Sequence, residues 1–341
     1  MKVAAAELRS MCKRILEGAG ASPDNATLVA EHLVLANLKG VDSHGVFHLP
    51  SYVDAIREGL LAPTATPSIL KEGGSHGLIS GHWTFGQVAA LYAINVAIDK
   101  AGQSGMSVVG LVQSHHIGRV GHYAERAADH GMACLIFTGG YGVEDPAAAP
   151  YGGRARLLHT NPIAFGFPGH REPAVTFDFA TTALAGSKVL VASRRNEQLP
   201  TNSIIDSEGR PTTDPDAFFA GGAFLPFGGH KGYALMVAGE LLGRVLTGSD
   251  DYAEESRGGP VMRHQGVAFV VLKADLLSDL DMVGSRVDDL EKQIRAVPPA
   301  PGFASVLVPG DPERAAFRDR TSDGLDIDQQ TWAALEILDQ A

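Results

Sequence analysis

The sequence predicts an α/β protein with a mixed or mostly parallel sheet, joined by a helical layer that both ends of the chain build. Three observations predict this architecture. The first ~60 residues show helical periodicity, short strands alternate with helices from about residue 70, and the tail returns to helix. We therefore expect a helical domain of residues 1–70 with 280–341, and a central α/β domain of residues 71–279.

The N-terminal region contains three helical patterns. In the first, apolar side chains recur at helical spacing between Leu8 and Leu16, and glycines end the pattern. Ser22 followed by Pro23 is typical of a helix start, with serine as the N-cap and proline in the first turn. A third helical pattern carries Leu49 and runs on to about residue 60.

The central region alternates between strand and helix patterns. The continuous apolar run at 106–112 is typical of a buried strand. The expected strands are 77–79, 106–112, 132–138, 174–179 and 266–272, and the expected helices are 86–102, 121–130, 183–192 and 231–246. Two further helices, 287–297 and 327–338, close the chain.

Composition excludes several classes of protein. Of the 341 residues 45% are hydrophobic, which is enough for a core, and the net charge of −11 disfavours binding to nucleic acid. The longest apolar stretch is interrupted by Glu240 and Arg244, so we expect no membrane segment, and the N-terminus predicts no signal peptide. Cys12 and Cys134 lie far apart, which favours a reducing compartment such as the cytoplasm.

Common nucleotide and catalytic motifs do not occur in the sequence. There is no Gly-x-Gly-x-x-Gly turn and no P-loop. There is also no His-Glu-x-x-His zinc helix and no Gly-x-Ser-x-Gly nucleophile elbow. The usual Rossmann turn and the α/β-hydrolase site are therefore not expected.

Polar chemistry concentrates first in residues 42–48, between two helical patterns. His44 is the residue type that gives or takes a proton near neutral pH, and Ser43 is placed to orient it. The alternative is a helix cap with an exposed histidine, which the residues alone slightly favour.

A second polar stretch, residues 113–123, follows the buried strand and precedes a helix. Ligands collect at the carboxyl ends of strands in α/β sheets, so its histidines and Arg119 form a candidate site. A metal site from His115, His116 and His122 is conceivable. However, no acidic residue occurs among them before Glu125, so we expect no metal.

The third stretch is Gly228-Gly229-His230-Lys231-Gly232, which leads into a long helix. Glycines let the backbone approach an anion, and the helix N-terminus adds N–H groups and a favourable dipole. The stretch predicts a pyrophosphate cradle, whereas the alternative is an ordinary turn with an exposed lysine. Elsewhere, Asp178 sits in an apolar strand, and His44 is a natural partner for that carboxylate.

These segments, in this order, resemble the malate/L-lactate dehydrogenase family, which is unrelated to the Rossmann-type enzymes. The family includes ureidoglycolate, sulfolactate and diketogulonate oxidoreductases and the piperideine/pyrroline-2-carboxylate reductases. The matching pieces include Asp42-Ser43-His44-Gly45, Ser114-x-His116-x-Gly118, Thr160-Asn161-Pro162, Asp178-x-Ala180-Thr181, Gly228-Gly229-His230-Lys231-Gly232 and Pro309-Gly310. They cover nearly the whole chain.

The resemblance implies a family-specific NAD(P)-binding fold in a homodimer. It implies hydride transfer between the nicotinamide of NAD or NADP and C2 of a small 2-hydroxy or 2-keto acid of the malate, lactate or sulfolactate kind. The cofactor contacts it implies are Asp178, Phe179, Ala180, Thr181, Thr182, His230, Lys231, Gly232 and Gly310.

The resemblance leaves two histidines for proton transfer. We expect His44 first, because Ser43 and Asp178 would orient it, with His116 as the alternative. The candidate substrate-binding residues are His48, Tyr52, Arg119, Thr160 and Asn161.

Two positions depart from the family pattern. Many relatives carry arginine, which clamps a carboxylate, where this chain has His48, and asparagine where it has Gln113. These departures put a plain malate or lactate substrate in question. The stretch Leu225-Pro226-Phe227-Gly228-Gly229-His230-Lys231-Gly232 resembles the imino-acid reductase branch of the family, so reduction of a cyclic ketimine is an alternative reaction. A histidine-based metal-dependent hydrolase or lyase is the alternative of another class.

Overall fold

A seven-stranded mixed sheet forms the centre of the protein in its computed structural model, which describes residues 2–170 and 175–340. The strands lie in the order β2-β3-β4-β11-β5-β6-β7. Their bounds are β2 (Ser68–Glu72), β3 (His76–Ser80), β4 (Met106–Val112), β5 (Met132–Gly139), β6 (Ile163–Phe167), β7 (Val175–Phe179) and β11 (Gly266–Lys273).

Most neighbouring strands of this sheet run antiparallel. Within the described residues, β3 and β4 form its one parallel pair. Two of the antiparallel pairs are made by β11, which returns late in the chain and inserts between β4 and β5. The sheet is thus mixed, as expected. The alternative expectation of a mostly parallel sheet is wrong.

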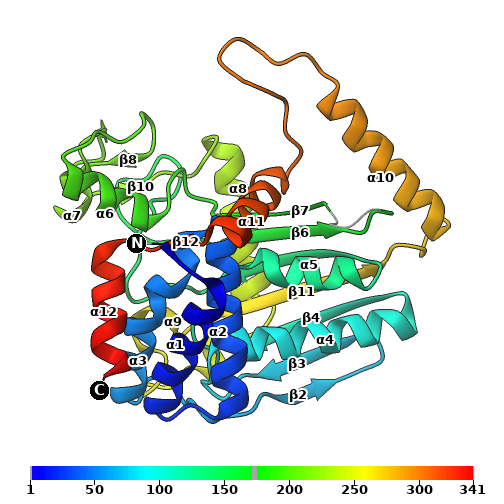
Figure 1. Cartoon of the computed structure of the whole chain (residues 1–341), viewed down its shortest axis with the longest axis horizontal. Helices are drawn as coiled ribbons and strands as arrows, with labels where there is room; N and C mark the ends of the chain where they lie inside the picture. The colour runs from blue at the N-terminus through cyan, green and yellow to red at the C-terminus, as the bar shows by residue number, and fades with distance from the viewer. Residues whose placement is uncertain (1, 171–174, 341) are drawn as a thin grey trace.

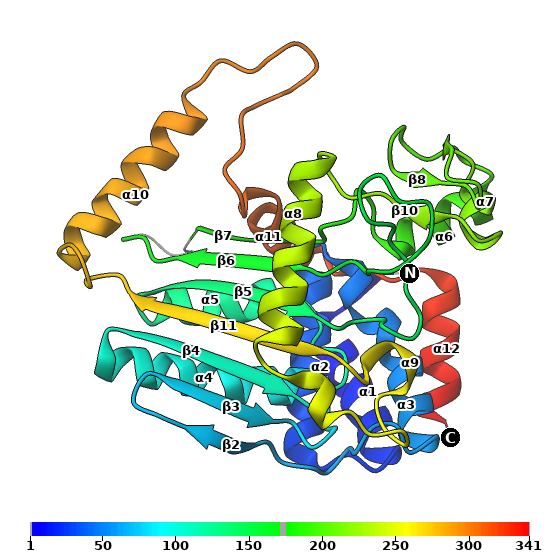
Figure 2. The same ribbon diagram turned by 180° about the vertical axis from the view of Figure 1, so that it is seen from behind.

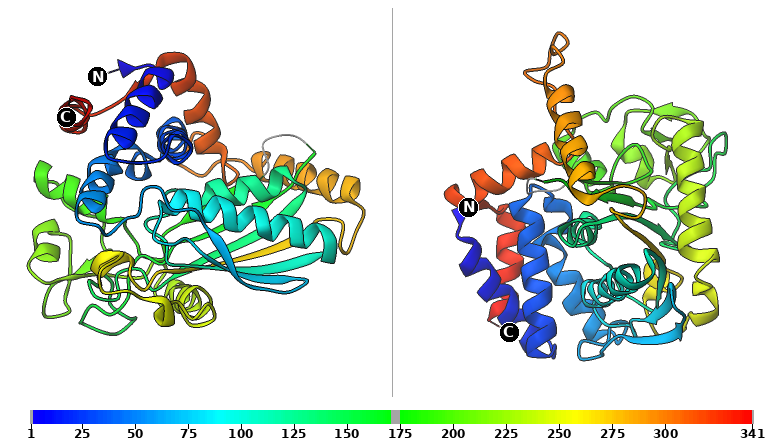
Figure 3. Two further views of the ribbon diagram at one scale, coloured as in Figure 1. Left: turned by 90° about the horizontal axis from the view of Figure 1, so that it is seen from below. Right: turned by 90° about the vertical axis from the view of Figure 1, so that its right-hand side faces the viewer.

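Helices cover both faces of the sheet. On one face lie α4 (Gly86–Ser104) and α5 (Gly121–Asp129), and on the other lies α8 (His230–Gly239) (Figures 2 and 3). Buried alanines on α4 let it approach the strands closely. The helix expected at 231–246 changes to a π-helix at Glu240–Val245, where a side chain on Gly243 would collide with the backbone of β5.

The two chain ends build one helical layer beside the sheet (Figure 1). Its helices are α1 (Ala5–Gly18), α2 (Pro23–Leu38), α3 (Leu49–Arg57), α11 (Asp311–Asp323) and α12 (Gln329–Asp339). β1 (Lys2–Val3) pairs with β12 (Leu325–Asp326) and ties the ends together. The expected cap of α2 is present, since the Ser22 hydroxyl accepts a hydrogen bond from the Asn25 N–H at 3.3 Å.

One helix near the C-terminus lies apart from this layer. α10 (Leu280–Arg295) and the loop after it extend away from the body of the molecule, beyond the end of β6 and β7 (Figures 1 and 3). His170 and Ser285 share a hydrogen bond of 3.0 Å that anchors this arm. The structure thus places α11 and α12, but not α10, against α1 to α3.

A smaller unit packs beside the N-terminal end of α8. It comprises α6 (Gly186–Arg195), α7 (Pro215–Phe219) and a three-stranded sheet of β10 (Ala223–Phe224), β8 (Ile204–Ile205) and β9 (Pro211–Thr212). The short helices are 3-10 turns at Asp42–His44, Val46–His48 and Ser249–Tyr252, together with α9 (Gly259–Met262). No helix in the described part of the chain is long and apolar enough to cross a membrane.

Candidate active site

The first histidine loop is fixed between the helical layer and the sheet. The side chain of Asn37, at the end of α2, accepts a hydrogen bond from the Val46 N–H at 2.9 Å and donates to Asp42 at 2.7 Å. Arg320 on α11 pairs with Asp42 at 2.6 Å. These contacts hold the 3-10 turn that carries Ser43 and His44, so His44 is a packed residue rather than an exposed one.

The second histidine loop follows β4 and is held from the sheet side. The Gln265 amide, just before β11, donates to the Ser114 hydroxyl and to the His115 carbonyl, both at 3.1 Å. The loop begins at Gln113, whose φ of 52° is left-handed. Asparagine tolerates that conformation better than glutamine, which gives a physical reason for the asparagine that relatives carry there.

The two loops bring the candidate histidines into one cluster. The rings of His44 and His116 stack with centroids 5.7 Å apart, and the His48 ring lies 4.5 Å from that of His116. Ser43 Oγ is 3.1 Å from His44 Nδ1, as its predicted orienting role requires. His48 Nε2 donates to the Ser43 carbonyl at 2.8 Å. Both candidate proton carriers therefore belong to a single site.

Tyr52 forms a hydrogen bond with His116. Its hydroxyl lies 2.7 Å from His116 Nδ1, and the Gln87 amide donates to the same hydroxyl, also at 2.7 Å. Because the hydroxyl accepts from Gln87, it donates its own proton to His116 Nδ1. The neutral His116 ring then carries its proton on Nε2. Gln87 was missed from the sequence because it looks like one more residue of α4.

The electrostatic surroundings shift the pKa values of the clustered histidines to different extents. Burial lowers the pKa of His116 well below its usual value, and the neighbouring histidines lower it further. Burial and the charge of His44 lower the pKa of His48 to about 4, against the opposing effect of its hydrogen bond to Ser43. Burial also lowers the pKa of His44, but the Asp178 carboxylate opposes that shift.

Asp178 acts on His44 through its charge. Among the described contacts its carboxylate has one hydrogen bond, which it accepts from the Gly121 N–H at 2.7 Å at the start of α5. The sequence suggested a direct hydrogen bond between His44 and Asp178. The described residues do not form it. The carboxylate is still close enough to raise the pKa of His44.

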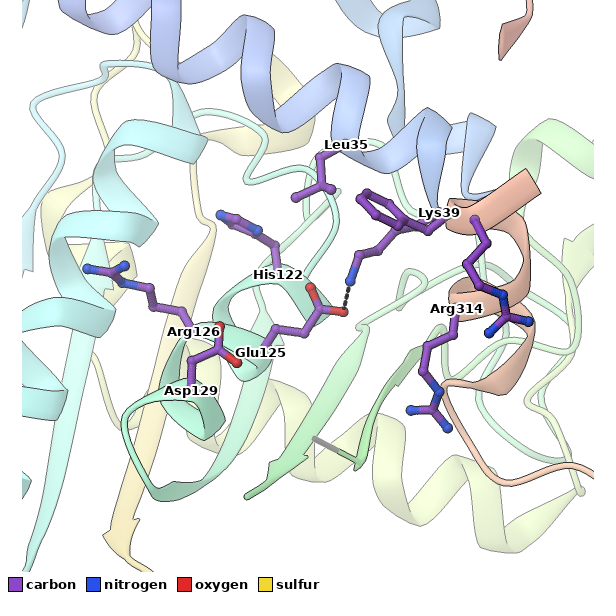
Figure 4. Close-up of a pocket in the computed structure, with 9 residues that line it drawn as sticks. Leu35, Lys39, His122, Glu125, Arg126, Asp129 and Arg314 are labelled. Carbon is purple, nitrogen blue, oxygen red and sulfur yellow. Dashed lines mark hydrogen bonds and ion pairs between the residues drawn. The ribbon is translucent and has the colours of Figure 1, made fainter. Parts of the chain in front are cut away.

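Arg119 is occupied by an ion pair. Its two terminal nitrogens donate to Glu125 at 2.6 and 3.0 Å, and its side chain is only 3% exposed. Lys39 meets the same carboxylate at 2.6 Å, on the wall of a cavity of about 620 Å³ between α2, α5 and α11 (Figure 4). The geometry of Arg119 favours a structural role over the predicted role in substrate binding.

The predicted cofactor segments lie next to one another. Thr181 and Thr182 follow β7, and their backbone pairs with Thr160 on one side and with the Pro226-Phe227 turn on the other. Phe179 packs edge-on against Phe227, with ring centroids 5.4 Å apart. Ala180 lies between these contacts. The segments that the sequence connected only by resemblance are thus continuous in space.

The start of α8 has the form of an anion cradle. Gly228 and Gly229 have left-handed φ values of 57° and 65°, and little stands near the position where a Cβ would be. His230 and Lys231 open the helix, and a side chain on Gly232 would collide with the Phe227 backbone. Exposed N–H groups and an exposed lysine at a helix start fit a pyrophosphate.

The remaining predicted residues frame this area. Gly310 is the left-handed N-cap of α11 and lies against β7, because a Cβ there would be 3.0 Å from the Thr176 carbonyl. Asn161 is buried and donates to the Met236 carbonyl and to Glu240. The Thr160 carbonyl accepts from Thr181.

A metal cluster is not formed by the candidate histidines. Among residues 2–170 and 175–340, no three His, Cys, Asp or Glu side chains are grouped so that they could hold a metal ion. His122 packs against His32 at 4.8 Å between ring centroids, whereas His116 packs against His44.

The fold is shared with a solved enzyme structure. A putative malate/lactate dehydrogenase from Escherichia coli superimposes with a TM-score of 0.91 at 31% identity, over 100% of this chain and 95% of that one. Together with the clustered pair of histidines, this likeness defines a dehydrogenase.

The sequence comparisons identify the family. The malate/L-lactate dehydrogenase family matches residues 3–336, and the chain belongs to that family. The L-lactate dehydrogenase of Cupriavidus necator is 38% identical over 344 residues, and the malate/(S)-sulfolactate dehydrogenase of Methanothermus fervidus is 35% identical over 344 residues. Both alignments cover 100% of this chain and 98% of the relative. The hydrolase or lyase alternative is thereby set aside.

Proposed function

We propose that this dehydrogenase interconverts a 2-oxo acid and the corresponding 2-hydroxy acid with NAD or NADP, and that His44 carries the proton. The balanced reaction is 2-oxo acid, reduced cofactor and one proton giving 2-hydroxy acid and oxidised cofactor. When bound, the nicotinamide supplies or accepts the hydride at C2. The single observation that supports the proposal is the stacked pair of His44 and His116, in which His44 is within reach of the charge of Asp178, a member of the predicted cofactor segment.

The support for His44 is electrostatic. Asp178 holds its pKa nearer neutrality, whereas every neighbour of His116 drives that pKa down. A neutral His116, with Nε2–H outward, is suited to donate a hydrogen bond to the substrate oxygen. His44 is suited to give that oxygen its proton during reduction and to take it back during oxidation.

The cofactor assignment rests on the adjacency of its segments. Asp178 to Thr182 would lie along the dinucleotide, His230, Lys231 and Gly232 would meet a phosphate, and Gly310 would let the α11 start approach it. The choice between NAD and NADP follows from kinetics. Oxidation of NADH and of NADPH is measured at 340 nm with a panel of 2-oxo acids and cyclic imino acids. Oxidation with a 2-oxo acid is the expected result, and no binding of either dinucleotide would refute the proposal.

Assembly and location complete the proposed function. The α10 arm, taken with the loops before and after the helix, carries large apolar side chains in contact with solvent, such as Leu277 at 93% and Phe303 at 71% exposure. A second copy of the chain would cover them, which supports a homodimer. Cys12 and Cys134 are both free and buried, which supports a reducing, cytoplasmic location.

A further inference from the structure

A cavity of about 390 Å³ opens beside the histidine cluster, and we name it the tail pocket. Because His116 and Tyr52 form part of its wall, a substrate held at the cluster would extend its tail into this space. The side chains and loop that define it are His48, Tyr52, Asp54, Glu58, His115, His116, Tyr141 and residues 258–262.

The charge of the tail pocket is negative. Asp54 and Glu58 stand four residues apart at the end of α3, on one side of the helix. Lysine and arginine do not occur among the residues that line this cavity in the described part of the chain. His48 also lines the cavity, and its Nε2 proton is already donated to the Ser43 carbonyl. Its other ring nitrogen is an acceptor in the neutral form, so it offers nothing to an anion.

Three arginines of neighbouring loops are engaged elsewhere. Arg119 is held by Glu125, and Arg263, which follows the 258–262 loop, pairs with Glu144 at 2.7 Å. Arg257, which precedes that loop, donates to the Gly59 carbonyl. Lys188 and Arg194 line a different cavity, on the side of His48 that faces α6 and α12. Arg57 pairs with Asp54 at 3.7 Å, but both side chains are exposed and Arg57 does not line the cavity. A second negative charge on the substrate would therefore meet Asp54 and Glu58 and no cation among the described residues that line the cavity.

The rest of the wall is apolar. Ala55, Leu60, Val261 and Met262 line the pocket next to the two acids. An aliphatic tail would lose contact with water against these side chains, which favours its binding. A neutral or cationic tail would also be compatible with the acids at the mouth.

Resting on the proposed function, the geometry points to selection by tail charge: the tail pocket accepts 2-oxo and 2-hydroxy acids with a neutral, apolar or cationic tail and discriminates against a second anionic group. Malate-like and sulfolactate-like substrates would then be poor ones for this chain. The discrimination comes from Asp54 and Glu58 and from a cavity lining without lysine or arginine in the described part of the chain.

The test compares two substrates that differ in one group. Oxaloacetate has a carboxylate in its tail, and 2-oxosuccinamate has a carboxamide of nearly the same shape. We expect kcat/KM for the amide to exceed that for oxaloacetate by about tenfold, the order expected of charges at a solvated site. Glu58→Gln with Asp54→Asn should reduce the ratio several-fold, while His48→Arg should raise kcat/KM for oxaloacetate. Glu7→Gln, an exposed acid on α1, is the matched control and should leave the ratio unchanged.

The outcomes separate this inference from the proposed function. Equal or faster turnover of oxaloacetate by the unmodified enzyme overturns selection by tail charge, while reduction of a 2-oxo acid itself upholds the proposed function. A ratio that survives the Asp54→Asn, Glu58→Gln pair overturns the assignment to these acids. If no member of a panel with pyruvate and 2-oxobutyrate is reduced, the proposed function fails, and the inference fails with it.

Discussion

The imidazole ring of His44 lies against that of His116, with centroids 5.7 Å apart and planes inclined by 21°. The two rings have different supports at Nδ1: the Ser43 hydroxyl for His44 and the Tyr52 hydroxyl for His116. The Asp178 charge raises the pKa of His44 against the effect of burial, and no such charge acts on His116. Two adjacent histidines are thereby suited to two different tasks, proton transfer and hydrogen bonding.

The two tasks predict different kinetics for the two histidine variants. His44→Gln removes the proton carrier, so we expect kcat to fall by about 10² to 10⁴-fold and the pH profile to lose the limb that His44 controls. His116→Gln keeps an N–H donor near the substrate, so we expect a smaller fall with the limb retained. Steady-state kinetics across pH, on the substrate found at 340 nm, measure both. A larger loss and a lost limb for His116→Gln would reverse the assignment.

The Tyr52 hydroxyl predicts a stability effect in addition to its influence on His116. Tyr52→Phe removes the partner of Gln87 Nε2, which is buried, and of His116 Nδ1, which is partly buried. Leaving buried polar groups unpaired costs about 1–3 kcal/mol in the free energy of unfolding. Urea unfolding followed by circular dichroism measures this loss. Tyr92→Phe, on α4 and only partly buried, is the control and should change little.

The elements that could be predicted from the sequence are those with clear apolar periodicity. α1, α2, α4, β4 and β11 were expected because each buries a regular row of apolar side chains. α11 was missed because it has no fully buried residue, so its helical spacing left no apolar signal. The antiparallel insertion of β11 between β4 and β5 was also hidden, since strand order depends on long-range pairing.

The site was predictable as a set of segments and not as a set of contacts. His44, Ser43 and His116 were identified from chemistry and resemblance, and the structure brings them together. Gln87 and Tyr141 were missed because one is a polar residue in a helix and the other an aromatic residue in a glycine-rich loop. The pairing of Arg119 with Glu125 was missed because a charged loop residue gives no sign of burial in the sequence.

The buried histidines predict an acid-sensitive fold. Burial is the largest influence that lowers the pKa to about 4 for His48, His115, His122 and His159, well below the usual 6.5. The unfolded chain therefore binds more protons than the folded one between these values, and the free energy of unfolding falls as pH drops from about 6.5 to about 4. Chemical unfolding at several pH values measures this effect. The slope of the unfolding free energy against pH should correspond to the uptake of more than one proton on unfolding. A flat profile over this range would contradict the burial of these rings.

The α10 arm predicts a dimer that depends on apolar contact. Replacing Leu277 and Phe303 by aspartate puts charges where a second copy would have to cover them, so we expect monomers in sedimentation velocity. Leu277→Met with Phe303→Leu keeps the apolar character and should leave the dimer intact. If the aspartate variant still sediments as a dimer, the two copies associate through another surface.

Glu125 predicts the largest stability effect of a single substitution. Burial alone would raise its pKa, but the hydrogen bonds and charge of Arg119, with a further contribution from Lys39, lower it to about 2. Because Arg119 is almost fully buried, Glu125→Gln removes its ion-pair partner and leaves only the weaker influence of the Asp178 and Glu313 charges, so we expect a loss of about 3–5 kcal/mol in the free energy of unfolding. The contribution of this carboxylate is complete above pH 4.5 and is lost as pH falls toward 2, so the variant and the parent should converge in acid. Glu208→Gln, at an exposed pair with Arg210, is the control and should change nothing measurable. If Glu125→Gln is no more destabilising than this control, the guanidinium has another partner, and Arg119 returns as a candidate for the substrate carboxylate.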